Sequence, residues 1–460
     1  MENHEMAKLE RANFGSRLGV ILATAGSAVG LGNVWRFPYM AGENGGAVFI
    51  MIYVVCVLLL GIPCMISEFI VGRHGRANTA RAFRTLSGGN AWSLIGYMGV
   101  LTGFLITGYY AVVAGWCMQY IWSSLIGHMQ GSPEYFQQYF LELINDPVKP
   151  VVWTVIMLGM TYLIIEHGVR DGIERASKMM MPTLFILLLI IVVAACMLPN
   201  ADKGIEFLFK PDFSKINSNV FLAALGQSFY SLSIAMGCLC TYASYFAKQT
   251  NLTSSAIQIG VIDSLVAILA GLMLFPAAFS VGVNPDSGPS LIFITLPNVF
   301  AQAFAGVPLL GYVISLLFFS LLTLAALTSL MSLHEVSTAF FQEELVITRK
   351  KAALIVTVTT AIIGALCSLS LGAVGDSMVL FGKSLFDWFD FITGQIFLPI
   401  VGFLTCIFIG WAAPHKLVHD EFTNWGTLRG RFFHFYLFLV KYICPLAILF
   451  IFLHQLGLLN

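Results

Sequence analysis

Residues 26–33, GSAVGLGN, interrupt the first long apolar segment of the chain, which spans residues 13–40. A glycine in a helix interior costs about 1 kcal/mol relative to alanine, and this stretch places three glycines close together. We therefore expect the helix to unwind in the middle of the segment.

A second break lies in the apolar segment 217–246. Residues 230–237, YSLSIAMG, place small hydroxyl side chains where they compete for backbone hydrogen bonds. Lipid cannot satisfy free N–H and C=O groups, so irregular backbone at membrane depth is tolerated only inside protein or along a polar cavity. Both breaks therefore predict parts of a binding site. The alternative is that Gly30 and its neighbours only form a close-packing face between helices.

The composition is that of an integral membrane protein. Of 460 residues, 58% are hydrophobic and 10% are charged, with a mean hydropathy of +0.84, whereas soluble domains are about a quarter charged. We expect one all-α membrane domain over residues 1–460, with about eleven helices long enough to cross the bilayer. These lie at residues 13–40, 45–71, 92–126, 150–168, 178–198, 217–246, 252–282, 303–342, 351–373, 386–411 and 433–456.

The two breaks fall in the first and sixth of these helices. This spacing is typical of two five-helix repeats of opposite orientation, whose broken helices meet at the middle of the membrane. We expect the first inverted repeat over residues 13–198, the second over residues 217–411, and an extra eleventh helix at residues 433–456.

The basic residues predict the orientation. With a cytoplasmic N-terminus, most of the 24 lysines and arginines fall in cytoplasmic connections, as the positive-inside rule requires. The outer connections hold only Lys149, Lys203, Lys210, Lys215 and Lys383. An odd number of helices puts the C-terminus outside, and we expect a multi-pass protein of the cell (inner) membrane. Because the formal net charge is zero, no nucleic-acid partner is expected.

At the two breaks the sequence resembles the neurotransmitter:sodium symporter family, and specifically its bacterial amino-acid branch, of the tyrosine or hydrophobic amino-acid type. The signature lies in residues 26–38 and 43–46. The match continues through Gly61-Ile-Pro63, Tyr109-Tyr110, Gly226-Gln227, Thr241-Tyr-Ala-Ser-Tyr245, Leu327-Thr-Ser329 and Asp390-Phe391. The resemblance covers essentially the whole chain. It implies a secondary transporter that couples amino-acid uptake to sodium by alternating access, with inverted repeats and broken helices.

The resemblance also implies two sodium ions as the only cofactors. The first sodium site consists of Ala28, Asn33, Ser231 and Asp263, completed by the substrate carboxylate, so ion and substrate binding depend on each other. The second consists of the backbone oxygens of Gly26, Val29 and Ala325 and the hydroxyls of Thr328 and Ser329. Hard oxygen donors without a cluster of carboxylates suit a monovalent ion better than calcium. Without the resemblance, these two hydroxyls read as bonding back to their own helix.

For the substrate, the resemblance assigns the carboxylate to the amides of Leu31 and Gly32 and the hydroxyl of Tyr110. Carbonyls of the broken sixth helix and Ser233 receive the ammonium group. The substrate side chain faces Ile106, Val113, Tyr230, Met236 and Leu333, which carry no charge, so we expect a hydrophobic or aromatic amino acid. The alternative is that these five are ordinary core residues.

Asp263 departs from the family pattern, because animal members and many bacterial ones carry asparagine at this position. Chloride-independent bacterial members usually carry glutamate one turn further along, where this chain has Ala267. An intramembrane carboxylate is costly and functional by default. We expect Asp263, beside Tyr53 and Gln227, to supply the negative charge that chloride supplies elsewhere. A further hypothesis is that it takes a proton on the return step, which leaves open a proton-coupled carrier of the same fold.

The resemblance places an outer gate at Arg36 and Asp390, above Tyr230. The inner latch corresponds to Arg11, Tyr245 and Glu343, with glutamate in place of the usual aspartate. A channel or a non-transporting receptor is the alternative from another class, but no continuous charged pore lining is visible. No P-loop or Ser/His/Asp constellation is present, so an enzyme is not expected. The oligomeric state stays open.

Overall fold

The computed structural model describes residues 12–129, 131–282, 291–372 and 375–458. Within these ranges nine helices or helix runs are long and apolar enough to cross a membrane, and the bent pair at the N-terminus makes a tenth. They are α1 (Arg17–Ala28) with η1 (Gly32–Arg36) and α2 (Phe37–Glu43); α3–η2–α4 (Ala47–Gly75); α6 (Ser93–Leu125); α8 (Lys149–Glu166); η3–α9 (Val169–Cys196); α13 (Leu252–Ser280); α15 (Pro308–Glu344); α16 (Arg349–Leu371); α18–η6–α19–η7 (Leu385–Ala412); and α21–η8–α22 (Phe433–Gln455).

The remaining predicted span, the sixth at residues 217–246, consists of two shorter helices. These are α11 (Ser218–Ser231) and α12 (Cys238–Ala243), which are separated by six residues without regular helix. The predicted break in the sixth helix is therefore present, and it is the reason that neither half is long enough to span the bilayer alone.

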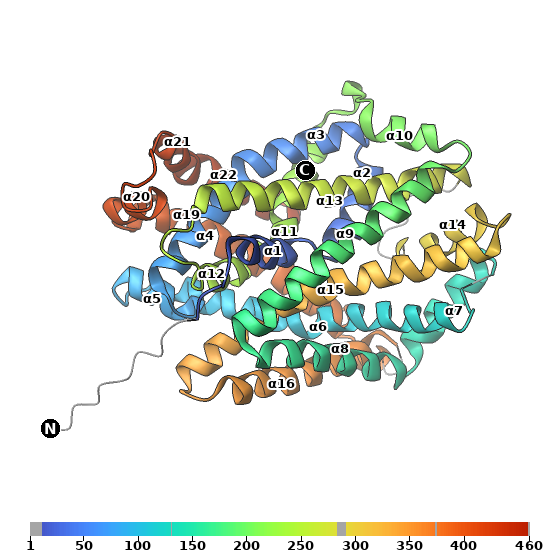
Figure 1. The fold of residues 1–460 in the computed structure, drawn as a ribbon, viewed down its shortest axis with the longest axis horizontal. Coiled ribbons are helices and arrows are strands. Elements are labelled where there is room, and N and C mark those ends of the chain that lie inside the picture. The colour runs from blue at the N-terminus through green and yellow to red at the C-terminus, as the bar shows by residue number, and fades with distance from the viewer. Residues whose placement is uncertain (1–11, 130, 283–290, 373–374, 459–460) are drawn as a thin grey trace.

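Short helices connect the spans at the two ends of the molecule. They are α5 (Thr79–Ser87), α7 (Pro133–Asn145), α10 (Ala201–Phe209), η4 (Phe213–Lys215), α14 (Thr295–Ala303), α17 (Gly375–Met378) and α20 (His415–Phe422). In Figure 1, α5 and α20 lie at one end of the bundle and α7 and α14 at the other. The two broken helices lie in the middle, where α1 packs against α9, α13 and α15.

The fifth predicted helix, residues 178–198, begins earlier than expected. The span starts at Val169 with the π-helix η3 (Val169–Glu174). The charged residues of this stretch indicated a loop, but Glu174 is buried against the start of α1. Its carboxylate accepts hydrogen bonds from the backbone N–H of Gly15 at 2.5 Å and the hydroxyl of Ser16 at 2.8 Å. A charge with such partners is tolerated inside the fold, so the helix continues through it.

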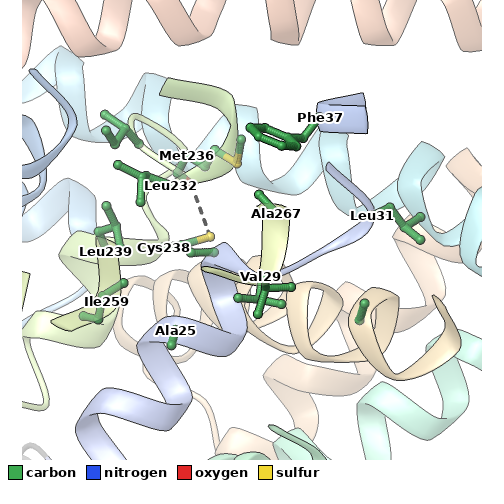
Figure 2. Packing of buried hydrophobic residues seen from close by; sticks show 14 of the residues in the cluster. Ala25, Val29, Leu31, Phe37, Leu232, Met236, Cys238, Leu239, Ile259 and Ala267 are labelled. Atoms are coloured by element: carbon green, nitrogen blue, oxygen red, sulfur yellow. Dashed lines mark hydrogen bonds between the residues drawn. The ribbon is translucent and has the colours of Figure 1, made fainter. Parts of the chain in front are cut away.

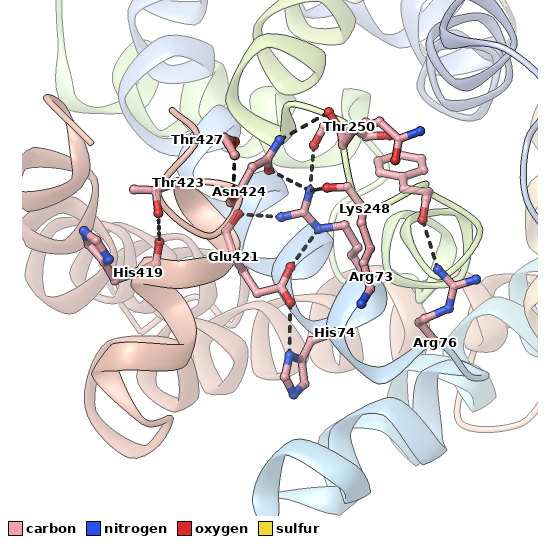
Figure 3. Close-up of polar contacts among 12 residues, drawn as sticks. Arg73, His74, Arg76, Lys248, Thr250, His419, Glu421, Thr423, Asn424 and Thr427 are labelled. Carbon is pink, nitrogen blue, oxygen red and sulfur yellow. Dashed lines mark hydrogen bonds and ion pairs between the residues drawn. The ribbon is translucent and has the colours of Figure 1, made fainter. Parts of the chain in front are cut away.

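A buried arginine joins three segments at the end that carries α20 (Figure 3). Arg73, at the end of α4 (Ile62–Gly75), is 2% exposed, and its Nε lies 2.7 Å from Oε2 of Glu421 on α20. Its Nη1 donates to the carbonyl of Thr250 at 2.6 Å and to the side-chain oxygen of Asn424 at 2.9 Å. The end of α4, the loop after α12 and the α20 region are therefore held together by one guanidinium group.

Candidate functional site

The first break turns backbone groups at the centre of the molecule toward side-chain partners. Helix α1 ends at Ala28, Val29 is extended with ψ of 100°, and the two halves of the span are bent by 55°. The N–H of Leu31 donates to the hydroxyl of Tyr110 at 3.2 Å. A Cβ atom on Gly30 would lie 2.4 Å from Oγ of Ser329, so Ser329 would have to shift to admit any side chain there. Figure 2 shows Val29 and Leu31 on the two sides of this turn.

The second break is held in a conformation that side chains rarely adopt. Ser233 and Ala235 have φ angles of 53° and 69°, and such strain clusters at functional sites. The N–H of Ala235 donates to Oε1 of Glu68 at 2.5 Å, so a buried carboxylate satisfies an amide that the unwound helix leaves free. The hydroxyl of Ser233 donates to the carbonyl of Ser27 at 2.8 Å. The two breaks thus contact each other directly.

Three of the residues predicted for the first sodium site meet between the breaks. Asp263, which is fully buried, accepts from Asn33 Nδ2 at 2.7 Å on one carboxylate oxygen and from the hydroxyl of Ser231 at 2.7 Å on the other. The hydroxyl of Tyr53 donates to the same carboxylate at 3.0 Å. Ala28, the fourth predicted residue, lines the adjacent cavity. These oxygens form a compact anionic group with donors that suit a small hard cation.

The residues predicted for the second sodium site lie where α1 unwinds against α15. The hydroxyl of Thr328 is 3.0 Å from the carbonyl oxygen of Ala325 and 3.5 Å from that of Val29. A Cβ atom on Gly26 would lie 3.4 Å from Cβ of Thr328, so these two residues are neighbours where α1 packs against α15. Ser329 faces the same turn through its contact with Gly30. Three of the five predicted oxygen donors, those of Val29, Ala325 and Thr328, therefore lie near one another, and neutral oxygens of this kind suit sodium.

A cavity of about 40 Å³ lies between the breaks. Of the predicted substrate residues, seven line it: Gly32, Ile106, Tyr110, Tyr230, Ser233, Met236 and Leu333. The other two predicted residues do not line the cavity. The amide of Leu31 donates a hydrogen bond to Tyr110, which does line it, and Val113 is buried elsewhere in the core. The lining carries no charge and combines hydroxyl groups and glycine backbone with apolar side chains. Such a cavity suits a small zwitterion with an apolar side chain.

Sequence reasoning assigned no site role to five residues that line this cavity: Ser27, Gly30, Tyr109, Gly394 and Leu398. A signal was present for the last two. Asp390, Gly394 and Leu398 are spaced by four residues along one helix, so they lie on the same face as the predicted outer gate residue.

The comparisons with known proteins agree with this geometry. The model of the sodium:neurotransmitter symporter family matches residues 11–130 and 127–459. The chain belongs to the sodium:neurotransmitter symporter family. It is 39% identical to MhsT, whose crystal structure in complex with L-phenylalanine superposes with a TM-score of 0.86 and covers 97% of this chain and 100% of that one.

Two curated relatives are similar over nearly the whole length of this symporter. Both are described as uncharacterized sodium-dependent transporters. YhdH of Bacillus subtilis is 35% identical, over 99% of this chain and 100% of its own. A protein of Haemophilus influenzae is also 35% identical, over 97% of this chain and 98% of its own. This symporter is therefore a multi-pass membrane protein of a sodium-dependent transporter family.

A second, larger cavity of about 360 Å³ lies on the other side of Tyr230, and we call it the vestibule. The predicted outer gate residues Arg36 and Asp390 both line it, together with Tyr39 and Gln395. The Arg36 guanidinium lies 4.3 Å from the centre of the Tyr230 ring. Among the ion pairs within 4 Å in the described part of the chain, none joins Arg36 to Asp390. The two charges of the symporter's predicted outer gate thus face the same space without closing over it.

At the opposite end, Arg11 lies outside the described residues. The other two residues of the predicted inner latch have partners that the sequence did not indicate. The hydroxyl of Tyr245 donates to Oε1 of Glu335 at 2.5 Å, and Glu335 is paired with Arg349. Glu343 accepts from the backbone and side-chain nitrogens of Asn78 at 2.9 Å and 3.0 Å. Phe14 packs edge-on against Tyr245, so the segment before α1 contacts the end of the broken sixth helix.

Proposed function

We propose that this symporter carries a hydrophobic or aromatic amino acid together with sodium across the inner membrane. The observation that carries the proposal is the uncharged cavity between the two breaks, which is lined by hydroxyl groups, glycine backbone and apolar side chains. MhsT was crystallised with L-phenylalanine, and its 39% identity over 97% of this chain supports the same substrate class.

The ion sites follow from the two oxygen clusters. One sodium binds at Ala28, Asn33, Ser231 and Asp263 beside the substrate carboxylate, and the second binds at Gly26, Val29, Ala325, Thr328 and Ser329. Since the first ion and the carboxylate share a contact, each increases the affinity for the other.

Transport on this proposal is independent of chloride. The carboxylate of Asp263 already accepts from Tyr53, Ser231 and Asn33, so a fixed negative charge occupies the place of an anion. When sodium leaves, this carboxylate is the group that takes a proton for the return step.

The proposal also includes the topology. The N-terminus lies in the cytoplasm and the C-terminus outside, and the two inverted repeats run from α1 to α9 and from α11 to η7. Each repeat begins with a broken helix, which supports this division. Alternating access then moves the broken helices relative to the remaining spans around a fixed site.

The test is uptake of radiolabelled phenylalanine, tryptophan and leucine into proteoliposomes at a fixed membrane potential. An imposed sodium gradient is expected to drive uptake, with chloride replaced by gluconate without effect. Uptake driven only by a proton gradient would establish the proton-coupled alternative and reject sodium symport. Loss of uptake on chloride replacement would reject the role given to Asp263.

A further inference from the structure

The central cavity and the vestibule share three lining residues. Tyr230, Gly394 and Leu398 line both, so they form the partition between the two spaces. Tyr230 is a large ring held by Arg36, and Leu398 is a branched side chain. Gly394 is the member of the partition that contributes no side chain at all.

Neither the backbone nor the packing requires a glycine at position 394. Its φ is not positive, and it lies within the π-helix η6 (Phe391–Phe397). No heavy atom outside its immediate neighbours lies within 4 Å of where its Cβ would be. At Gly103, in contrast, a Cβ would lie 2.9 Å from the carbonyl oxygen of Met236. Glycine is the less favourable choice in a helix, so its presence here needs another reason.

The surroundings of Gly394 are held in place on both sides. The hydroxyl of Thr393, the preceding residue, forms a hydrogen bond of 3.2 Å with the hydroxyl of Tyr109. Across the partition, the Arg36 guanidinium covers the ring of Tyr230. A side chain at position 394 would therefore enter open space beside residues that line both cavities.

The volumes of the two cavities limit the size of the side chain that the central cavity, the one between the breaks, can hold alone. The central cavity is about 40 Å³ and the vestibule about 360 Å³. A substrate whose α-amino and α-carboxyl groups are bound at the breaks has little room for a large side chain in the central cavity alone. We propose that Gly394 is a specificity-determining residue, which admits large side chains by letting them extend through the partition toward the vestibule. This inference rests on the proposed function, because it concerns which amino acids the same site accepts.

The test is a series of substitutions, Gly394→Ala, Gly394→Val and Gly394→Phe, with uptake of tryptophan, phenylalanine, leucine and valine measured for each. Since the added atoms enter open space, the variants are expected to fold, which a thermal melt verifies. The matched control is the same series at Gly159 of α8, a helical glycine that also has no atom within 4 Å of its Cβ position. One or two methyl groups in a binding pocket change discrimination by about tenfold or more. The ratio of tryptophan to valine uptake is therefore expected to fall by about tenfold for Gly394→Val and to stay constant at Gly159.

A second substitution tests the steric explanation. In the Gly394→Val background, Leu398→Ala removes volume from the same partition and is expected to restore tryptophan uptake. An equal loss for all four substrates, an unchanged ratio, or a double variant without recovery would each overturn the assignment. Failure of the proposed function is a separate result, because the unsubstituted protein would then show no sodium-driven uptake of any of the four.

Discussion

At the scale of single residues, Asp263 is the group with the greatest consequence. It is a fully buried carboxylate that accepts from three different helices, and replacing it changes the charge without changing the shape. For Asp263→Asn we expect sodium-driven uptake without chloride to fall by at least about tenfold, since losing a charged hydrogen-bonding partner costs about 1.5–3 kcal/mol. Chloride at high concentration is expected to restore part of the uptake by this variant, because a mobile anion then supplies the missing charge.

The measurement is uptake by the Asp263→Asn variant in chloride and in gluconate. A suitable control is Asp420→Asn, which changes a carboxylate outside the site. Full activity of Asp263→Asn in gluconate would show that the fixed charge is not needed.

The substitution Gly30→Ala tests how closely the first break packs against α15. A methyl group there would lie 2.4 Å from Oγ of Ser329 and 3.2 Å from the hydroxyl of Tyr110. Overpacking of this kind costs about 1–3 kcal/mol, so the sodium affinity of Gly30→Ala is expected to fall by about 5- to 150-fold. Binding of sodium, followed by isothermal titration or substrate competition, checks this, with Gly159→Ala as the control. An unchanged affinity would place the second sodium elsewhere.

At the scale of elements, the Arg73–Glu421 pair connects α4 to α20, and both side chains are almost completely buried. Removing one partner of a buried pair costs about 3–5 kcal/mol, because the other charge is left uncompensated. Arg73→Met is therefore expected to lower the unfolding temperature markedly, and the double variant Arg73→Met/Glu421→Leu is expected to recover part of the loss.

The surface pair of Lys149 and Asp146 gives the matched comparison for Arg73→Met. Lys149 is 65% exposed, and a pair of this kind contributes about 0–1 kcal/mol. Thermal unfolding in detergent compares Lys149→Met with Arg73→Met. Equal effects of the two substitutions would mean that the buried network does not hold α20 against α4.

At the scale of the whole molecule, ion and substrate binding are expected to stabilise the folded state together. A ligand at 100 times its Kd adds about 2.7 kcal/mol to the free energy of unfolding. Sodium is expected to raise the melting temperature by a few degrees where potassium does not, and phenylalanine is expected to add to this only when sodium is present. Stabilisation by phenylalanine in potassium alone would contradict the shared contact between ion and carboxylate.

Features of the fold could be predicted from the sequence where they depend on interactions between residues close together in the chain. The two breaks at residues 26–33 and 230–237 were predictable, because glycine clusters and competing hydroxyls act on their own helix. The start of the fifth helix was not. Its charged residues looked like a loop, and only the contact of Glu174 with the start of α1 allows them inside the span.

The same division applies to the site. The sequence by itself determined an all-helical membrane protein and the positions of its breaks, because hydropathy and helix propensity are local properties. Only the tertiary structure decided that Tyr245 bonds to Glu335, that Val113 stays out of the cavity, and that Gly394 opens the partition. Cavities and buried networks are formed by helices that lie far apart in the chain, so the packing of those helices, and no local pattern, places each side chain within them.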